Sequence, residues 1–424
     1  MGKIYIKTFG CQMNDRDSEA LLGLFLQKGY IQAKSEKDAE VILVNTCSVR
    51  DHAENRALSL LGTYKKFKQG TEGRWTKDEG QKMKSSNVRA KRSSIASRKV
   101  IGLIGCMAKN KGDEIFSKMP YIDLICGPSA FFKIPEYVER IKRSKRSERS
   151  PERLKEVLSE AEGRPKGVEG DKGLRIKDLE DRDRDESFYD SVYRKEPDHA
   201  QVVISTGCSN FCAYCIVPHT RGRLRPRNPD KIIAEIKENI KQDRRKITLL
   251  GQNVNDYHFK SQVINFVELL RKIDKIEGLE ELDFVTSHPK NTCQELFKVM
   301  AESDKIKKHL HLPFQSGSNR ILKLMRRGYS REEYIELTNQ YKQITGGTLG
   351  TDIIIGFPSE TEEDFNQTKS LVEEVGFKYA FIFKYSPRLK TKAAEMVDDV
   401  LEKVKSRRHK KLLDLQKEIS ASIK

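Results

Sequence analysis

The 424-residue sequence lacks any unbroken apolar run long enough to cross a membrane as a helix. Its start, MGKIYIKTFG, has no signal-peptide core and instead reads as a β-strand. Ile6 stands where a myristoylation signal requires serine or threonine. These absences predict a cytoplasmic protein, in which clustered cysteines more often bind metal or perform chemistry than form disulfides.

The sequence also has too few acidic residues to balance its basic ones. Lys and Arg number 80 and Asp and Glu number 62, which gives a formal net charge of +18. Such a surplus predicts a polyanionic partner, most simply nucleic acid. Residues 65–100 hold 12 basic and 3 acidic residues, so one segment supplies half of the surplus. Solvated lysine-rich loops are the plainer explanation.

The first 140 residues predict one parallel α/β domain, because strand-like and helix-like runs alternate. A polar, basic stretch at about 65–98 interrupts this pattern and predicts a flexible insertion. Residues 141–199 carry 16 basic and 16 acidic residues and predict a charged, flexible linker. The strands expected before residue 140 are KIYIKTF, EVILVN, KVIGLIG and IDLIC.

From residue 200 to 395 the alternation is strict. Six strand–helix steps predict a parallel, partly open (β/α)6 barrel. Residues 396–424 predict a basic amphipathic helix packed on that barrel. The fold class expected is therefore α/β, with an N-terminal parallel domain followed by the barrel.

Three cysteines follow three successive strands of the first domain. They are Cys11, Cys47 and Cys106. Ligands of parallel sheets bind where the strands end, so we expect the three thiols to meet at one edge. Three thiolates can hold an iron–sulfur cluster that leaves one iron without a protein ligand. Unrelated buried cysteines are the alternative.

A second set is packed into eight positions, at Cys208, Cys212 and Cys215, directly after the strand QVVIST. Zinc sites normally need four ligands, and His219 could supply the fourth. A three-thiolate 4Fe–4S cluster with one open iron fits the spacing better, and that iron could chelate S-adenosylmethionine beside Tyr214. Cys126 and Cys293 join neither set, and we interpret them as structural.

Polar residues follow the later barrel strands, on the rim where barrel enzymes keep their active sites. Each one alone could be an ordinary loop residue, but the repetition at one end favours a site. We predict cofactor contacts at Gly251, Gln252, Asn253, Gln315, Ser316 and Gly317. Further rim positions are Ser287, His288, Gly356, Ser386 and Arg388, and His219, Arg221 and Arg223 could meet RNA phosphates.

These motifs resemble the radical S-adenosylmethionine superfamily, and more narrowly its methylthiotransferases. The stretches that carry the resemblance include GCQMN, NTCSVR, IGCMAKN, CSNFCAYCIVPHTRGR, GQNVN and LPFQSGS. GCQMN and NTCSVR are similar to the members that act on N6-isopentenyladenosine next to the tRNA anticodon. Members that act on threonylcarbamoyladenosine tend toward GCKVN.

The resemblance implies methylthiolation of carbon 2 of that adenosine in the tRNA anticodon stem-loop. It implies two 4Fe–4S clusters: one at Cys208, Cys212 and Cys215 that cleaves S-adenosylmethionine, and an auxiliary one at Cys11, Cys47 and Cys106 where sulfur is delivered. It also implies an external one-electron donor and a sulfur source. We expect a monomer.

The sequence departs from the family pattern at two places that matter here. Family members usually end in a small RNA-binding barrel called TRAM, which we do not expect in this chain; the basic insertion could compensate. The family's usual SPRPGT reads SPRLKT at 386–391, so Leu389 and Lys390 replace a Pro-Gly turn. The alternatives are a threonylcarbamoyladenosine methylthiotransferase and a non-catalytic, metal-stabilised RNA-binding protein.

Overall fold

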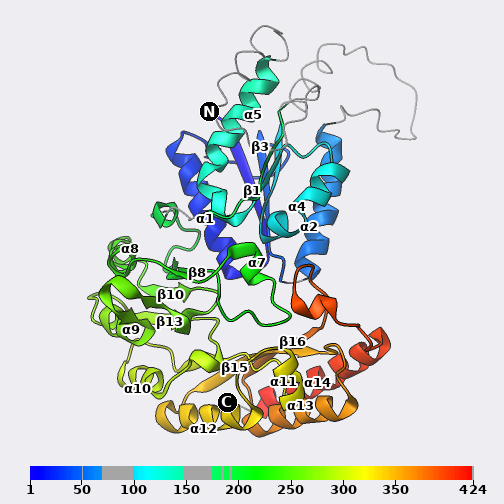
Figure 1. The fold of residues 1–424 in the computed structure, drawn as a ribbon. Coiled ribbons are helices and arrows are strands. Elements are labelled where there is room, and N and C mark those ends of the chain that lie inside the picture. Colours follow the sequence, from blue (N-terminus) through cyan, green and yellow to red (C-terminus); the bar gives the residue numbers. More distant parts are fainter. Residues whose placement is uncertain (50, 69–98, 148–173, 183–185, 191–192, 423–424) are drawn as a thin grey trace, which may run out of the picture. The chain divides into compact units, whose positions relative to one another are not determined.

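The computed structural model describes residues 1–49, 51–68, 99–147, 174–182, 186–190 and 193–422, and Figure 1 shows their ribbon. The predicted insertion at about 65–98 therefore lies mostly outside the described residues, as does much of the predicted linker. The chain divides into two compact units, Met1–Tyr193 and Arg194–Lys424. No helix among the described residues is long and apolar enough to cross a membrane.

The first unit is built on a six-stranded parallel sheet in the order β2-β1-β3-β4-β5-β6. β3 and β4 lie inside the sheet and are buried at every position, which explains their continuous apolar runs. The strands are β1 (Lys3–Phe9), β2 (Ile31–Gln32), β3 (Val41–Thr46), β4 (Val100–Gly105), β5 (Leu124–Cys126) and β6 (Ile176–Asp178). The main helices are α1 (Gln12–Gln27), α2 (Asp51–Thr63), α4 (Cys106–Lys118) and α5 (Ile134–Ser147).

The prediction of a solvated linker over 141–199 is wrong for its described parts. α5 continues to Ser147, and β6 adds an edge strand that pairs Ile176 with Leu124. Phe188 and Tyr189, in the short helix η3 (Glu186–Tyr189), are each 1% exposed. The sequence did not predict this strand, because three residues surrounded by charged ones contain too few apolar positions to show a strand pattern.

The second unit confirms the predicted barrel of parallel strands. One half pairs in the order β13-β10-β7 and the other in the order β14-β15-β16, and a parallel bridge from Leu282 to Ile306 links the halves. β7 and β16 do not pair with each other among the described residues, so the barrel is partly open. The strands are β7 (His199–Val203), β10 (Lys246–Leu250), β13 (Glu281–Phe284), β14 (His309–His311), β15 (Thr348–Ile355) and β16 (Tyr379–Lys384).

The helices of the second unit pack their apolar faces against these strands in one continuous core. Several begin with a reciprocal capping box, such as Ser330 with Glu333, which fixes where the helix starts. The last helix, α14, buries Leu412 and pairs Arg408 with Glu360 at 2.8 Å. The helices are α7 (Val217–Arg221), α8 (Pro229–Lys241), α9 (Phe266–Asp274), α10 (Gln294–Glu302), α11 (Asn319–Leu324), α12 (Arg331–Thr345), α13 (Glu362–Val375) and α14 (Glu402–Ser422).

Candidate metal-cluster sites

The register of the first sheet brings Cys11, Cys47 and Cys106 to one edge. Phe9 pairs with Thr46, and Thr46 pairs with Gly105, so β1, β3 and β4 end level with one another. Each cysteine follows its strand within two residues. Cys11 caps α1 and Cys106 begins α4, so two of the three thiols stand at helix N-termini. Strand register thus assembles residues that are almost a hundred positions apart.

The thiols of this set also interact electrostatically. A hydrogen bond to Cys11, burial, and the nearby Cys106 raise the pKa of the Cys47 thiol well above its usual value. The backbone amide of Val49 donates to Cys47 Sγ at 3.2 Å. Three thiolates this close would repel each other without a cation between them. This donor set therefore suits a positively charged metal cluster.

A buried amide pair that the sequence reading missed supports this edge. Cys11 Sγ lies 3.1 Å from Asn14 Oδ1, and Asn14 Nδ2 donates to Asn45 Oδ1 at 3.0 Å. Asn45 Nδ2 in turn donates to the Asn14 carbonyl and to Ser18 Oγ, each at 2.9 Å. Both asparagines are fully buried, so their hydrogen bonds lock α1 to the end of β3.

The second triad is held by one loop rather than by three strands. The loop leaves β8 (Ser205–Thr206), which pairs antiparallel with β9 (Arg225–Pro226), and passes through all three cysteines before α7. Two backbone bonds fold it, from Cys208 N to Gly222 O at 3.2 Å and from Cys215 N to Cys212 O at 2.9 Å. Ala213 N bonds to Met325 O at 2.9 Å, which ties the loop to the end of α11.

These thiols are crowded in the same way as the first set. Burial and the neighbouring Cys212 raise the pKa of Cys215 to about 12, and burial also raises that of Cys208. Among the described residues, no three His, Cys, Asp or Glu side chains converge closely enough to hold a single metal ion. A 4Fe–4S cube attaches each thiolate to a different iron, so its ligands stand further apart than those of one ion. Each set of three thiols has the number of protein ligands that a 4Fe–4S cluster with one open iron takes.

Two further side chains contact Cys212, and the spacing of the cysteines gives no sign of either. His288 Nε2 lies 3.8 Å from Cys212 Sγ, and burial lowers the pKa of that histidine to about 2. Arg327 NH1 donates to Cys212 Sγ at 3.3 Å and to the Tyr214 hydroxyl at 3.2 Å. His288 was noted as a rim position, but Arg327 was missed because it lies in the turn between α11 and α12, more than a hundred residues from the loop.

The predicted rim residues after β10 lie beside the cysteine loop. The Gln252 side chain accepts a hydrogen bond from Gly207 N, one residue before Cys208. Asn253 Nδ2 donates to Asn291 Oδ1 at 3.0 Å, and Asn210 of the cysteine loop donates to the same oxygen at 3.2 Å. Gly251 packs against Ser205, where an added Cβ would come within 2.7 Å of the hydroxyl. These three residues therefore connect β10 to the loop.

The predicted residues after β14 and β15 are engaged mostly with helices. Gly317 N bonds to Thr368 Oγ1 at 2.9 Å, and its Cβ position lies 2.5 Å from the Gln367 carbonyl on α13. The Ser316 hydroxyl lies 3.5 Å from that of Thr368. Gln315 has a φ of 70°. Its backbone amide donates to the Asp352 carbonyl of β15 at 3.0 Å. Gly356 N bonds to Glu360 Oε2 at 2.7 Å.

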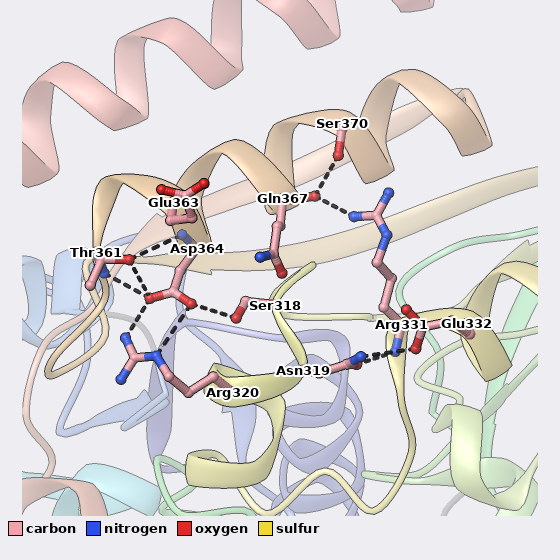
Figure 2. Close-up of a pocket in the computed structure, with 10 residues that line it drawn as sticks. All are labelled: Ser318, Asn319, Arg320, Arg331, Glu332, Thr361, Glu363, Asp364, Gln367 and Ser370. Carbon is pink, nitrogen blue, oxygen red and sulfur yellow. Dashed lines mark hydrogen bonds and ion pairs between the residues drawn. The ribbon is translucent and has the colours of Figure 1, made fainter.

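A pocket of about 750 Å³ opens where α11, α12 and α13 begin, and none of the six triad cysteines lines it. Figure 2 shows that four of its lining residues, Asp364, Arg320, Ser318 and Thr361, bond to one another. Asp364 accepts from Arg320, from Ser318 Oγ at 2.5 Å and from the Thr361 hydroxyl at 2.8 Å. Arg331 pairs with Glu374 at 2.9 Å. These contacts join the start of α11 to the start of α13 and the start of α12 to the end of α13.

Comparison with known sequences adds the family context. The model of the Radical SAM superfamily matches residues 202–372, and that of Uncharacterized protein family UPF0004 matches residues 3–127. The tRNA-2-methylthio-N(6)-dimethylallyladenosine synthase of Clostridium botulinum strain Alaska E43 is 39% identical over 96% of this chain and 79% of its own length. The enzyme of the same name from Clostridium tetani is 40% identical over 98% of this chain and 81% of its own length.

Solved structures share the fold. The cobalamin-dependent S-adenosylmethionine radical enzyme OxsB aligns with a TM-score of 0.54 at 12% identity, over 99% of this chain and 56% of that one. The radical S-adenosylmethionine methyltransferase TsrM from Kitasatospora setae aligns with a TM-score of 0.53 at 12% identity, over 93% and 77%. At this identity the likeness concerns the fold alone.

Proposed function

Because the chain belongs to the family of tRNA-2-methylthio-N(6)-dimethylallyladenosine synthases, we propose that it methylthiolates carbon 2 of N6-isopentenyladenosine next to the anticodon of tRNA. The observation that carries the proposal is the pair of cysteine triads, one in each unit. A non-catalytic RNA-binding protein would need only one structural metal site, if any. Two sets of three thiols suit two clusters that each keep one iron open to a ligand.

The two triads hold different cofactors in this proposal. Cys208, Cys212 and Cys215 hold the 4Fe–4S cluster of the barrel unit, residues 200–395. Cys11, Cys47 and Cys106 hold the auxiliary cluster of the N-terminal domain, residues 1–140. When bound, the clusters and S-adenosylmethionine supply the radical chemistry and the methylated sulfur that the side chains cannot provide. The protein's own part is to hold the thiolates, bind the cofactor at the barrel rim and exclude water.

We propose that several side chains at the rim bind the cofactor. Tyr214 lies between Cys212 and Cys215 in the sequence. Its hydroxyl accepts a hydrogen bond from Arg327, which fixes the position of the ring. Gln252 and Asn253 are fixed by bonds to Gly207 and Asn291, so they offer rigid polar edges next to the loop. Gln315 follows β14 in the other half of the barrel, and we propose that it contacts the cofactor from there. Ser316 and Gly317 support that position through α13.

The RNA contact is proposed at the exposed end of the cysteine loop. Phe211 is 41% exposed and has a φ of 48°, an unusual conformation for an aromatic residue. The guanidinium of exposed Arg223 lies 5.6 Å from its ring centre. Aromatic rings and arginine planes are the groups on which unpaired bases stack. The pair is therefore suited to a nucleotide of the anticodon loop, and His219 and Arg221 to its phosphates.

The remaining partners follow from the chemistry. Reductive cleavage needs an external one-electron donor, and each turnover consumes sulfur from an outside source. Because the proposed substrate is tRNA, we propose that the protein acts in the cytoplasm. We propose a monomer.

The test is nucleoside analysis of tRNA from cells that lack the native enzyme and express this chain. We expect 2-methylthio-N6-isopentenyladenosine to appear by mass spectrometry, and Cys208→Ala to abolish it. Appearance of the 2-methylthio derivative of threonylcarbamoyladenosine would assign the other substrate. Absence of both products, with zinc in the purified protein, would favour the RNA-binding alternative.

For the RNA contact, Phe211→Ala should weaken binding of an anticodon stem-loop by about 1–3 kcal/mol, the usual value of one stacked base. Val263→Ala is the matched control, because Val263 is 72% exposed on a different hairpin of the same unit, residues 258–265. Unchanged affinity in Phe211→Ala would exclude this contact.

A further inference from the structure

Arg327 is a buried positive charge without a carboxylate partner. Its side chain is only 3% exposed, and no aspartate or glutamate pairs with it among the described residues. Three other arginines buried in this unit do pair with a carboxylate. Arg194 and Arg227 both pair with Glu235, at 2.6 Å and 2.7 Å, and Arg408 pairs with Glu360 at 2.8 Å.

Three neutral groups and one cysteine fix the guanidinium. Arg327 Nε donates to the Tyr329 hydroxyl at 3.0 Å, and NH2 donates to the Pro313 carbonyl at 2.7 Å. NH1 is shared between the Tyr214 hydroxyl at 3.2 Å and Cys212 Sγ at 3.3 Å. The Tyr329 hydroxyl is itself anchored on the Phe314 carbonyl at 2.9 Å. The arginine therefore cannot swing away toward solvent.

A buried charge is expensive unless an opposite charge lies beside it. In this environment, the group able to carry negative charge next to the guanidinium is the Cys212 thiolate. Tyr214 and Tyr329 meet the guanidinium through hydroxyl groups and Pro313 through its carbonyl oxygen, none of which is a carboxylate. A further side chain at this sulfur, His288, places its Nε2 3.8 Å away and carries no carboxylate.

We propose that Arg327 is a positioning residue that holds the Cys212 thiolate by an N–H···S hydrogen bond and, through its fixed charge, raises the reduction potential of the cluster bound at Cys208, Cys212 and Cys215. The inference rests on the proposed function, which places a cluster at this triad. Reduction adds one electron, supplied by the external one-electron donor, and hence one negative charge to the cluster. A fixed cation at hydrogen-bond distance from one of its sulfurs favours the more negative state.

The experiment is a potentiometric titration of the cluster, followed by electron paramagnetic resonance. The background is full-length Cys11→Ala/Cys47→Ala/Cys106→Ala, so that only the barrel cluster contributes a signal. In it we compare Arg327→Met, which removes the charge, with Arg327→Lys, which keeps it. Arg326→Met is the matched control, because Arg326 is adjacent in the sequence and its side chain is exposed. Iron content and circular dichroism are measured on each variant.

We expect Arg327→Met to lower the equilibrium constant for reduction at least tenfold, which for one electron is about 59 mV. Arg327→Lys should recover most of this shift, and Arg326→Met should show none. If the methionine variant does not fold, Arg327→Gln replaces it, since glutamine can still donate to Pro313 O. Equal potentials in the parent and the neutral variant at full iron content would overturn the inference, as would equal shifts in the lysine and methionine variants.

These outcomes remain distinct from failure of the proposed function. A parent protein that takes up no iron at Cys208, Cys212 and Cys215 would refute the cluster itself. Full iron with an unmoved potential would refute only the role of Arg327.

Discussion

The two cysteine triads reach the same composition by opposite routes. Cys208, Cys212 and Cys215 lie on one loop, and short backbone bonds within that loop bring them together. Cys11, Cys47 and Cys106 come from three strands, and only the register of β1, β3 and β4 brings them level. The first arrangement is encoded by spacing, and the second by the whole sheet.

The two triads should therefore be sensitive to changes in different contacts. The loop triad depends on a few local contacts, including one from Met325 and one from Arg327 outside the loop. The strand triad depends on three turns that must all leave the sheet in the correct direction, braced by the Asn14–Asn45 pair. Perturbing one scaffold should therefore empty one site and spare the other.

The largest expected effect comes from removing each triad in turn. Anaerobically reconstituted protein should hold about eight irons, and Cys208→Ala/Cys212→Ala/Cys215→Ala should hold about four. Cys11→Ala/Cys47→Ala/Cys106→Ala should also fall to about four. Iron and sulfide analysis checks both variants. Four irons in the wild type that vanish with the loop triad would mean that the strand triad holds no cluster.

Glycine substitutions should separate the two scaffolds. Gly10 precedes Cys11 and has a φ of 137°, and a Cβ added to it would lie 2.3 Å from the Cys47 Cβ. Gly207 precedes Cys208 and has a φ of 75°, and a Cβ added to it would lie 2.2 Å from the Arg223 carbonyl oxygen. Either change to alanine should cost about 2–4 kcal/mol, since strained backbone and overpacking add. Denaturant unfolding measures the cost, and iron analysis should show loss of the adjacent cluster only.

Gly29→Ala is the matched control for both. Gly29 also has a positive φ, 78°, but no atom lies within 4 Å of its Cβ position. It should cost about 1 kcal/mol from backbone strain and leave both clusters in place. Loss of iron in this variant would show that backbone strain alone, rather than the clash, empties the sites.

Acid should loosen the barrel that carries the loop triad, through Asp364. Burial alone would raise the pKa of Asp364, but hydrogen bonds from Arg320, Ser318 and Thr361 lower it well below its usual value. A lowered pKa stabilises the folded state above pH 4, and this contribution is lost as the pH falls further. Asp364→Asn should therefore cost about 1–3 kcal/mol at pH 7.

Arg320 is 47% exposed, so most of that cost should come from the hydroxyl and amide hydrogen bonds rather than from the ion pair. Unfolding curves of wild type and Asp364→Asn should converge as the pH is lowered below about 4. A difference that does not change with pH would mean that Asp364 is not ionised in the folded protein.

The smallest expected effect concerns the turn after β16. Lys390 has a φ of 73°, and Thr391 N bonds to Arg388 O at 3.1 Å, so the turn keeps the conformation that suits Pro-Gly although the sequence reads Leu-Lys. Lys390→Gly should stabilise the protein by about 0.5–1 kcal/mol because it removes this strain. Thermal unfolding measures the gain, and a loss of stability would show that the lysine side chain makes a contact worth more than the strain.

Sequence reasoning predicted the long periodic elements well and the short ones poorly. β1 begins and ends where the run KIYIKTF predicts, and the six parallel barrel strands lie within the predicted range 200–395 or start one residue before it. β6 and η3 were assigned to a linker, because their few apolar residues are surrounded by charges. They are stable because the edge of an existing sheet and the underside of α1 supply the contacts that local sequence lacks.

By itself, the sequence determined the six cysteines, their division into two sets and the alternation that forms both parallel sheets. Spacing and period are local properties, and the covalent chain carries them directly. Tertiary structure alone decided that Asn14 meets Asn45 and that Arg327 and His288 flank Cys212. Those neighbours come from segments far apart in the chain, and only the packing of whole helices on whole strands brings their side chains within hydrogen-bond distance.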